Sequence, residues 1–269
     1  MSAPGPEAEA LPPLSPGQRL RSALLDLRFR LSRRLRWRRP GYVETPALAL
    51  DGLPPATQAR IAELAAAYGE RFEQRFDRRN ALENYLYLDL LDRLRGELGS
   101  GWPQGGEWLD VGSKNFWYAS VLRAALRPSR LIGIEIEGYR IYRDGHSRHD
   151  YAMHYLRDLT DTEYRVQDAF TWRQPVDGIS CFYPFLLPGT VLAWGLPARL
   201  LRPRALFAHL ASLLRPGGHL LMVNQGLDEW QLVQALLQPT GLRLLAQRLV
   251  APALLPRPAP PVLSLFVRD

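Results

Sequence analysis

Three acidic side chains follow three successive predicted strands in the second half of the chain. Asp110 lies in "LDVG", Glu135 ends "LIGIE", and Asp168 ends "YRVQD". Because ligands bind at the carboxyl ends of parallel strands, we expect these carboxylates at one edge of a sheet. An acid about twenty residues after a glycine turn can accept hydrogen bonds from ribose hydroxyls, and the next can accept from an adenine amine. The alternative for each acid is a helix cap or a turn residue.

Lys114 is the only lysine in a chain of 269 residues that contains 33 arginines. It follows Gly112 in the turn "GSKNF", just before a predicted helix. The N-terminus of a helix presents free N–H groups that favour anions, and an ammonium group adds to that preference. Lys114 is therefore a candidate partner for a ligand carboxylate or an acidic substrate. The alternatives are a solvated turn lysine or a salt bridge to a nearby acid.

Alternating strand and helix patterns position these side chains. The near-continuous apolar run "RLIGIEI" is typical of a strand buried on both faces of a parallel sheet. No helix separates the last two predicted strands, "LRLLAQRLV" and "PVLSLFVRD", so they should pair antiparallel. The alternation predicts an α/β fold, a doubly wound and mostly parallel sheet with an antiparallel C-terminal pair.

The N-terminal part divides into three predicted segments ahead of the α/β domain at 101–269. Residues 1–18 are Pro-rich and predicted to be disordered. Residues 19–40 form a basic amphipathic helix, and residues 45–100 a helical cap. Within that cap, Asn80 with Glu83 three residues later predicts the start of a second helix.

The basic helix has two contrasting faces. Nine arginines lie between residues 19 and 39, against the single acid Asp26, and the leucines recur at helical spacing: Leu20, Leu24, Leu27, Leu31 and Leu35. Such a helix can lie on an anionic membrane surface or meet another anionic partner. A targeting peptide and a helix packed on the domain are the alternatives.

Composition excludes several classes of protein. The formal net charge is +7. Because the near-total replacement of lysine by arginine indicates a GC-rich coding bias, the number of arginines is a weak argument for nucleic-acid binding. We find no nucleic-acid module. The single cysteine, Cys181, permits no intrachain disulfide and favours a cytoplasmic location. We find no apolar run of about 18 residues and no signal-peptide core in the first 15 residues. His146, His149 and His154 lack zinc-site spacing, so no metal is expected.

The α/β region resembles class I S-adenosylmethionine-dependent methyltransferases. The successive motifs "EWLDVGSKNFWYA", "LIGIEI", "VQDAF", "VDGISCFYPF" and "LLRPGGHLLMV" carry the resemblance over about residues 105–269. It implies a seven-stranded Rossmann-like sheet, S-adenosylmethionine as the cofactor, and methyl transfer to a small-molecule acceptor that the sequence does not identify.

The resemblance also assigns site residues. It implies that Asp110 and Gly112 belong to the cofactor loop, that Glu135 binds the ribose and that Asp168 lies beside the adenine. Tyr183 and Phe185, in "FYPF", are the implied substrate-facing residues. Methyl transfer needs little beyond alignment, so no catalytic base is assigned.

The first motif departs from the family at two positions. Lys114 and Phe116 stand where the family places glycines, which requires a shifted turn or a narrower pocket. Lys114 would pair with the carboxylate of the methionine moiety. A nicotinamide-dependent oxidoreductase needs three glycines in this turn, and "GSKNFW" has one. The remaining alternative is a catalytically inactive methyltransferase-like binding or scaffold protein.

Overall fold

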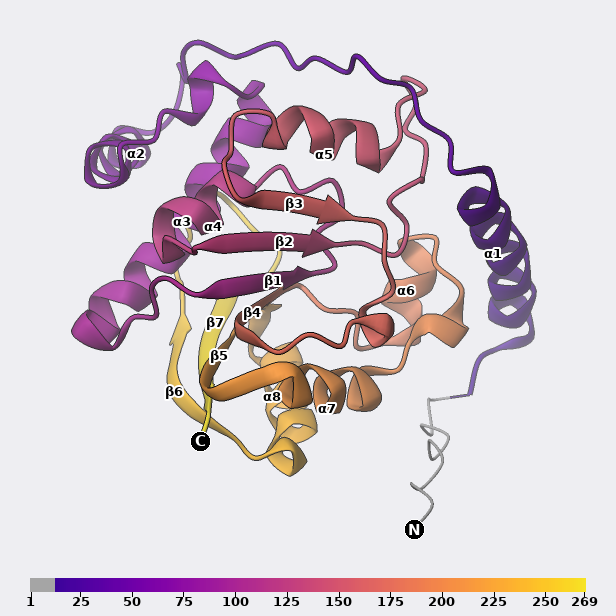
Figure 1. Cartoon of the computed structure of the whole chain (residues 1–269). Coiled ribbons are helices and arrows are strands. Elements are labelled where there is room, and N and C mark those ends of the chain that lie inside the picture. Colours follow the sequence, from indigo (N-terminus) through magenta and orange to yellow (C-terminus); the bar gives the residue numbers. More distant parts are fainter. Residues whose placement is uncertain (1–12) are drawn as a thin grey trace.

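A seven-stranded sheet forms the centre of the computed structural model, which describes residues 13–269 (Figure 1). The strand order is β3-β2-β1-β4-β5-β7-β6, parallel from β3 to β5, with β7 antiparallel between β5 and β6. The strands are β1 (Glu107–Val111), β2 (Arg130–Ile134), β3 (Thr162–Arg165), β4 (Val176–Phe182), β5 (Leu214–Gln225), β6 (Leu242–Leu249) and β7 (Pro261–Arg268). The chain runs outward from β1 to β3 and then crosses to β4 on the other side of β1. The switch in strand order, where such sheets bind ligands, therefore lies between β1 and β4.

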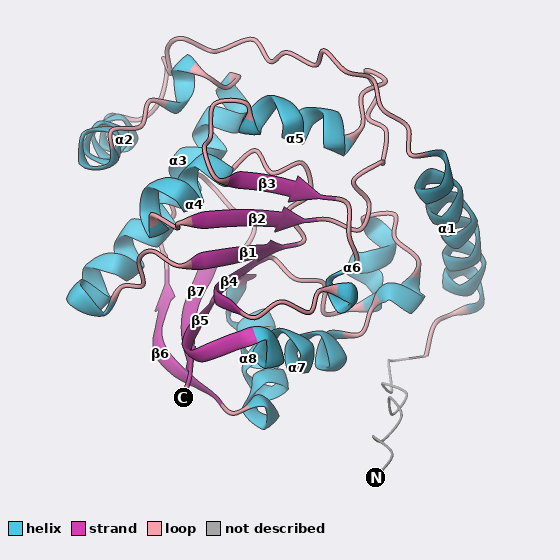
Figure 2. Ribbon diagram, viewed as in Figure 1, coloured by secondary structure: helices cyan, strands magenta, loops and turns pink. Residues whose placement is uncertain are grey.

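Helices surround this sheet (Figure 2). They are α1 (Pro16–Leu35), α2 (Pro55–Tyr68), α3 (Arg78–Leu98), α4 (Ala119–Leu126), α5 (Arg148–Leu156), α6 (Pro188–Ala193), α7 (Pro203–Leu213) and α8 (Gly226–Leu237). Short 3-10 turns cover Phe72–Gln74, Gly99–Gly101, Ala169–Thr171, Ala198–Leu200 and Gln238–Thr240. The predicted doubly wound sheet with its antiparallel C-terminal pair is confirmed.

Two apolar cores lie on opposite faces of the sheet. Side chains alternate between faces along a strand, so Trp108 and Leu109 of β1 join different clusters. Trp108 packs in the core under α3, α4 and α5, and Leu109 packs in the core under α7 and α8. The result is a three-layer α/β/α arrangement that fixes the strand ends.

Some predicted element ends are wrong by a few residues. The N-cap of α3 is Asp77, which accepts a hydrogen bond from the backbone N–H of Asn80 at 2.7 Å, so Asn80 lies inside the helix. Asp and Asn side chains can both cap a helix, and only the backbone path selects Asp77. Helix α1 begins at Pro16 with Ser15 as its N-cap, so residues 16–18 are helical. Residues 13–15 of the predicted disordered tail are described and belong to no helix or strand, and residues 1–12 lie outside the described residues.

Helix α1 lies at the carboxyl ends of the strands. In Figure 1 the arrowheads of β1, β2 and β3 point toward α1 and α6 and away from α2. Ser32 of α1 donates to the carbonyl of Tyr139 after β2, and Arg28 donates to the carbonyl of Gly195 after β4. Helix α1 is therefore hydrogen-bonded to both the loop after β2 and the loop after β4. Among residues 13–269, no helix combines the length and the apolar content that crossing a bilayer requires.

Candidate functional site

The loop after β1 repeats a left-handed backbone conformation at alternate residues. The φ angles are 82° at Gly112, 55° at Lys114 and 57° at Phe116. Side chains other than glycine rarely adopt this conformation. The loop therefore keeps, at two non-glycine positions, the dihedral angles that glycine usually provides.

Phe116 has its side chain in the protein core. Its ring is fully buried and lies against β2, where a Cβ atom built on Gly133 would stand 2.6 Å from the ring carbons. Gly133 thus leaves the room that the ring occupies. The departure at this position is accommodated inside the fold by the small residue on the neighbouring strand.

Asp110 holds the start of α4 against β4. Its carboxylate accepts hydrogen bonds from the Tyr118 hydroxyl at 2.7 Å and from the Ser180 hydroxyl at 2.6 Å. Complete burial raises the pKa of Asp110 to about 6, although these hydroxyl donors act in the opposite direction. The structure places Asp110 directly beneath the loop, in a structural network.

Glu135 binds the same loop from the end of β2. Its Oε2 accepts from the backbone N–H of Lys114 at 2.9 Å, and its Oε1 accepts from the backbone N–H of Glu137 at 2.8 Å. Arg148 Nη1, at the start of α5, lies 3.3 Å from Oε1. The carboxylate is buried, so a ribose hydroxyl would have to take the place of Arg148.

Arg148 is the main neighbour that the sequence analysis missed. It is buried between Glu135 and Glu137, and its Nε has no hydrogen-bond partner within the described part of the chain. The capping box that begins at Ser147 predicts the start of a helix at Arg148. No local pattern shows that its guanidinium reaches the end of β2.

Lys114 is partly buried, and it forms no salt bridge within the described residues. Its Nζ lies 4.8 Å from the ring centroid of Trp117 and 5.4 Å from that of Trp194, which follows α6. No carboxylate among residues 13–269 lies within salt-bridge distance of it. Burial, together with the charges of Arg148 and Arg79, lowers the pKa of Lys114 to about 8. A poorly solvated ammonium without a counter-ion suits an anionic ligand group.

Asp168 lies three residues beyond the end of β3, so the prediction that β3 ends at Asp168 is wrong. Its Oδ1 accepts from the backbone N–H of Phe170 at 3.0 Å and caps the turn Ala169–Thr171. The preceding Gln167 donates its backbone N–H to the carbonyl of Glu135 at 3.1 Å. Asp168 is therefore tied by the backbone to the end of β2, and its Oδ2 has no hydrogen-bond partner in the part of the chain that is described.

Tyr183 and Phe185 turn toward different parts of the molecule. Tyr183, with a φ of 53°, packs near Tyr87 of α3, with ring centroids 6.3 Å apart. Burial raises the pKa of Tyr183 to about 12, so its hydroxyl stays protonated at neutral pH. Phe185 instead packs on the cluster formed around Phe29 of α1. Of the two predicted substrate residues, Tyr183 lies on the α3 side and Phe185 on the α1 side.

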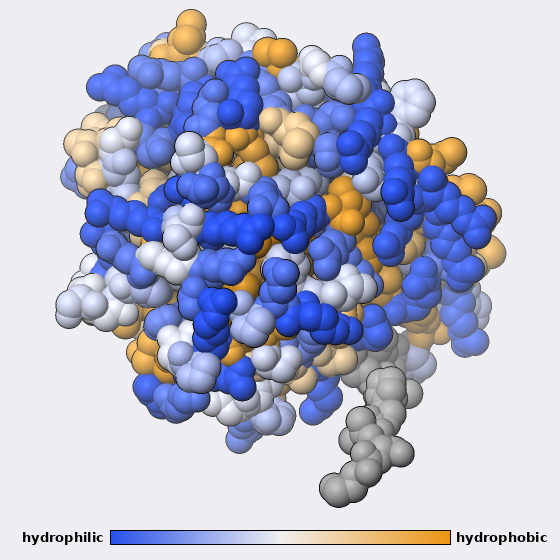
Figure 3. All heavy atoms as spheres, viewed as in Figure 1, coloured by the Kyte–Doolittle hydropathy of each residue, from blue (hydrophilic) through white to orange (hydrophobic). Residues whose placement is uncertain are grey.

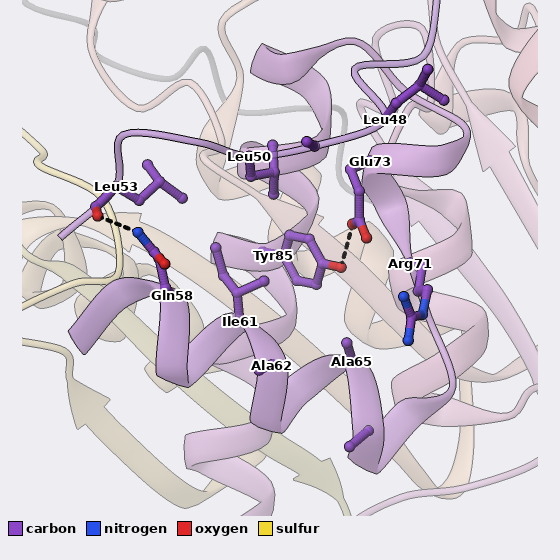
Figure 4. A pocket seen from close by; sticks show the side chains of 12 residues that line it. Leu48, Leu50, Leu53, Gln58, Ile61, Ala62, Ala65, Arg71, Glu73 and Tyr85 are labelled. Atoms are coloured by element: carbon purple, nitrogen blue, oxygen red, sulfur yellow. Dashed lines mark hydrogen bonds between the residues drawn. The ribbon is translucent and has the colours of Figure 1, made fainter. Parts of the chain in front are cut away.

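A surface pocket of about 390 Å³ lies elsewhere, between α2, the segment before it and α3. Figure 4 shows its apolar wall, including Leu50 and Ile61, and the Tyr85 hydroxyl that donates to Glu73 at 2.7 Å. Helix α2 is on the side where β1 to β3 begin (Figure 1). The pocket is therefore remote from the strand ends and from the acids discussed above.

The sequence matches no family model, and no relative is found among curated proteins. Solved structures share the fold. The magnesium protoporphyrin IX methyltransferase (ChlM) from Synechocystis PCC 6803, solved with bound SAM, is 13% identical, with a TM-score of 0.50, over 93% of this chain and 97% of that chain. The geranyl diphosphate C-methyltransferase from Streptomyces coelicolor A3(2), in complex with Mg²⁺, geranyl diphosphate and S-adenosyl-L-homocysteine, is 12% identical, with a TM-score of 0.50, over 96% of this chain and 100% of that chain. At these identities the likeness shows the fold alone. The chain has the Rossmann-like fold of these methyltransferases.

Proposed function

We propose that this protein transfers a methyl group from S-adenosylmethionine to a small-molecule acceptor at the carboxyl edge of β1, β2 and β4. The observation that carries the proposal is the loop at residues 112–116. It keeps three left-handed residues at the switch in strand order, and it holds a partly buried ammonium that forms no salt bridge with any residue from 13 to 269. The shared fold of two solved methyltransferases supports the same proposal.

The residues around the loop fit this cofactor. Lys114 would bind the carboxylate of the methionine moiety, because its charge has no carboxylate partner among residues 13–269. Glu135 would accept from the ribose hydroxyls after releasing Arg148, and Asp168 has a second carboxylate oxygen for the adenine amine. When bound, S-adenosylmethionine supplies a methyl group on a sulfonium, which is already a good leaving group.

The protein's own part in this reaction is to bind, orient and exclude water. Aromatic rings from α3, the start of α4 and the end of β4 pack together beside the loop, with Tyr87 and Tyr118 at 5.3 Å and Tyr118 and Phe182 at 5.5 Å between centroids. Tyr183 adjoins this group and, with its raised pKa, acts as a hydrogen-bond donor to an acceptor molecule. Alignment of the reactants then supplies most of the rate.

Thermal unfolding with and without S-adenosylhomocysteine tests the proposal. The melting temperature of the wild-type chain should rise with the concentration of this ligand, as for any ligand that binds the folded state. The rise should be lost in Glu135→Gln. It should persist in the matched control Glu97→Gln, which changes only a half-exposed ion pair with Arg248. No rise at millimolar ligand in the wild-type chain contradicts the proposal.

One observation favours the second candidate, a binding or scaffold protein on this fold that has no transferase activity. The carboxylate of Glu135 is buried and already has three donors, two backbone N–H groups and Arg148. If the wild-type chain and Arg148→Met both fail to bind S-adenosylhomocysteine, this second function is supported. In either case we propose a cytoplasmic location from the single cysteine, and we assign no nucleic-acid partner.

A further inference from the structure

Helix α1 exposes its leucines. Leu20, Leu24, Leu27, Leu31 and Leu35 are 48–74% exposed. We call these five side chains the leucine stripe. An amphipathic helix that packs on a domain turns such a stripe inward, so the orientation of α1 requires a different explanation.

The opposite face of α1 makes the contacts to the domain. Phe29 is buried in a cluster with Val191 and Leu196 of the α6 region, and the Ser22 hydroxyl accepts from the backbone N–H of Ala198 at 2.9 Å. Asp26, the one acid of the helix, pairs with Arg199. These specific contacts fix the helix with its leucine stripe pointing away from the protein. In Figure 3, apolar atoms appear at the outer margin of the region of α1, beside hydrophilic ones.

Arginines flank the leucine stripe on both sides. Nine lie between residues 19 and 39. Within the described chain, Arg30 is the only one of them whose guanidinium pairs with a carboxylate, that of Asp26. The guanidinium groups of Arg28, Arg38 and Arg39 donate hydrogen bonds to Gly195, Tyr139 and Asp144 of the domain, and the other arginines remain for an outside partner. The face therefore combines exposed apolar side chains with positive charge that the protein leaves uncompensated.

We propose that α1 docks the protein onto an anionic lipid bilayer surface. The leucine stripe enters the boundary between headgroups and acyl chains, and the arginines meet the anionic headgroups. This docking brings the loops after β2 and β4, to which α1 is bonded, close to the lipid. The inference rests on α1 alone and holds whether or not the proposed methyl transfer is correct.

The combination of positive charge and exposed leucines favours a bilayer over other partners that could cover this face of α1. A second copy of the chain would place two arginine-rich faces against each other across a two-fold axis, and like charges oppose that contact. A nucleic acid would meet the arginines but would leave the leucine stripe without an apolar partner. An anionic bilayer satisfies both features at once.

Co-sedimentation of the full-length chain with lipid vesicles tests the docking. The chain should bind vesicles of phosphatidylcholine with about one third phosphatidylglycerol, bind pure phosphatidylcholine vesicles much more weakly, and release at high salt. Replacing four residues together, Leu20→Ser, Leu24→Ser, Leu27→Ser and Leu31→Ser, should lower the partition coefficient more than about tenfold.

Matched controls keep the result specific. Leu227→Ser with Leu249→Ser changes leucines of similar exposure on α8 and β6, and should leave vesicle binding unchanged. The melting temperature of the fourfold variant should equal that of the wild type, because its leucines are exposed. Equal vesicle binding by the fourfold variant and the wild type overturns the proposal. A second combination of results also overturns it: the wild type is a dimer in light scattering and does not bind the vesicles, and the fourfold variant is a monomer.

Discussion

The Phe116 ring occupies the space in which a side chain at Gly133 would have to stand. A Cβ atom at Gly133 would lie 2.6 Å from two ring carbons of Phe116 and 2.8 Å from the Ser113 hydroxyl. The two residues belong to the loop after β1 and to β2, so this contact joins the candidate cofactor loop to the neighbouring strand. It explains how a phenylalanine ring fits at this position of the loop.

Gly133→Ala should therefore destabilise the protein by about 1–3 kcal/mol, because the added methyl group overpacks a filled core. Denaturant unfolding measures the change. Phe116→Leu leaves a small cavity and should cost a comparable amount alone. The double variant should cost less than the sum of the two single costs, because leucine vacates part of the space that the methyl group needs. Additive costs would show that the ring and the glycine are not in conflict.

Breaking the buried ion pair between Glu135 and Arg148 should be costly. Arg148→Met leaves the Glu135 carboxylate buried without its cation, and should lower the free energy of unfolding by about 3–5 kcal/mol. Adding Glu135→Gln to Arg148→Met should recover part of that loss, since residue 135 then carries no charge and Glu137 keeps its ion pair with Arg140. Urea titrations of the wild type, the two single variants and the double variant measure this coupling.

The same pair makes a prediction for ligand binding. If Arg148 competes with ribose hydroxyls for Glu135, then Arg148→Met should bind S-adenosylhomocysteine at least as tightly as the wild type, although it is less stable. Calorimetry at a temperature where both proteins are folded measures the two affinities. Weaker binding by Arg148→Met would show that the arginine supports the site instead of competing for it.

Lys114 should give the unfolding free energy a distinctive pH dependence. Its pKa is about 8 in the folded state and 10.5 is the ordinary value, so between these values the unfolded chain holds more protons. The wild type should therefore gain stability, relative to Lys114→Met, as the pH rises through that window. Below about pH 7 the methionine variant should be the more stable by about 1–2 kcal/mol. A stability difference that does not change between pH 7 and 9.5 contradicts this account of the buried ammonium.

Ligand binding should raise the lowered pKa of Lys114 again. A carboxylate beside the Lys114 ammonium favours the protonated form, so S-adenosylhomocysteine should be bound with uptake of a proton near pH 8.5. Titration calorimetry in buffers of different ionisation enthalpy counts the protons taken up. Lys114→Met should show reduced uptake. Equal uptake by both proteins would place the ligand carboxylate elsewhere.

The sheet could be predicted from the sequence because its signals are local. Apolar runs such as "LIGIEI" and the absence of a helix between the last two strands fixed the strand positions and the antiparallel pair. The end of β3 was predicted three residues too late, because apolar pattern alone does not show where backbone pairing stops. The cap of α3 was placed at Asn80 instead of Asp77 for a similar reason, since both residue types can cap.

The candidate site was harder to predict because its contacts are long-range. The sequence placed Asp110, Glu135 and Asp168 near the strand ends, but nothing local indicates that Arg148 reaches Glu135 or that Trp194 reaches Lys114. The left-handed backbone at Lys114 and Phe116 goes against residue preference, so only the fold reveals it. The periodicity of α1 showed a leucine face, but whether that face turns toward the domain depends on Phe29 and its partners.

Asp110 should make the protein less stable as the pH rises from about 4 to 6. Burial raises its pKa to about 6 from an ordinary value of 3.8, so in this range the folded state holds more protons than the unfolded chain. Stability due to this group is present below the ordinary value and is lost as the pH rises through 6. Relative to the wild type, the free energy of unfolding of Asp110→Asn should therefore rise by about 1–3 kcal/mol across this window and change little above it.

Ser180→Ala removes a hydrogen bond to the charged carboxylate, which raises the pKa of Asp110 further. This variant should therefore move the pH window to higher values. Chemical denaturation at a series of pH values measures all three proteins, and a difference between wild type and Asp110→Asn that stays constant from pH 4 to 7 would refute the raised pKa.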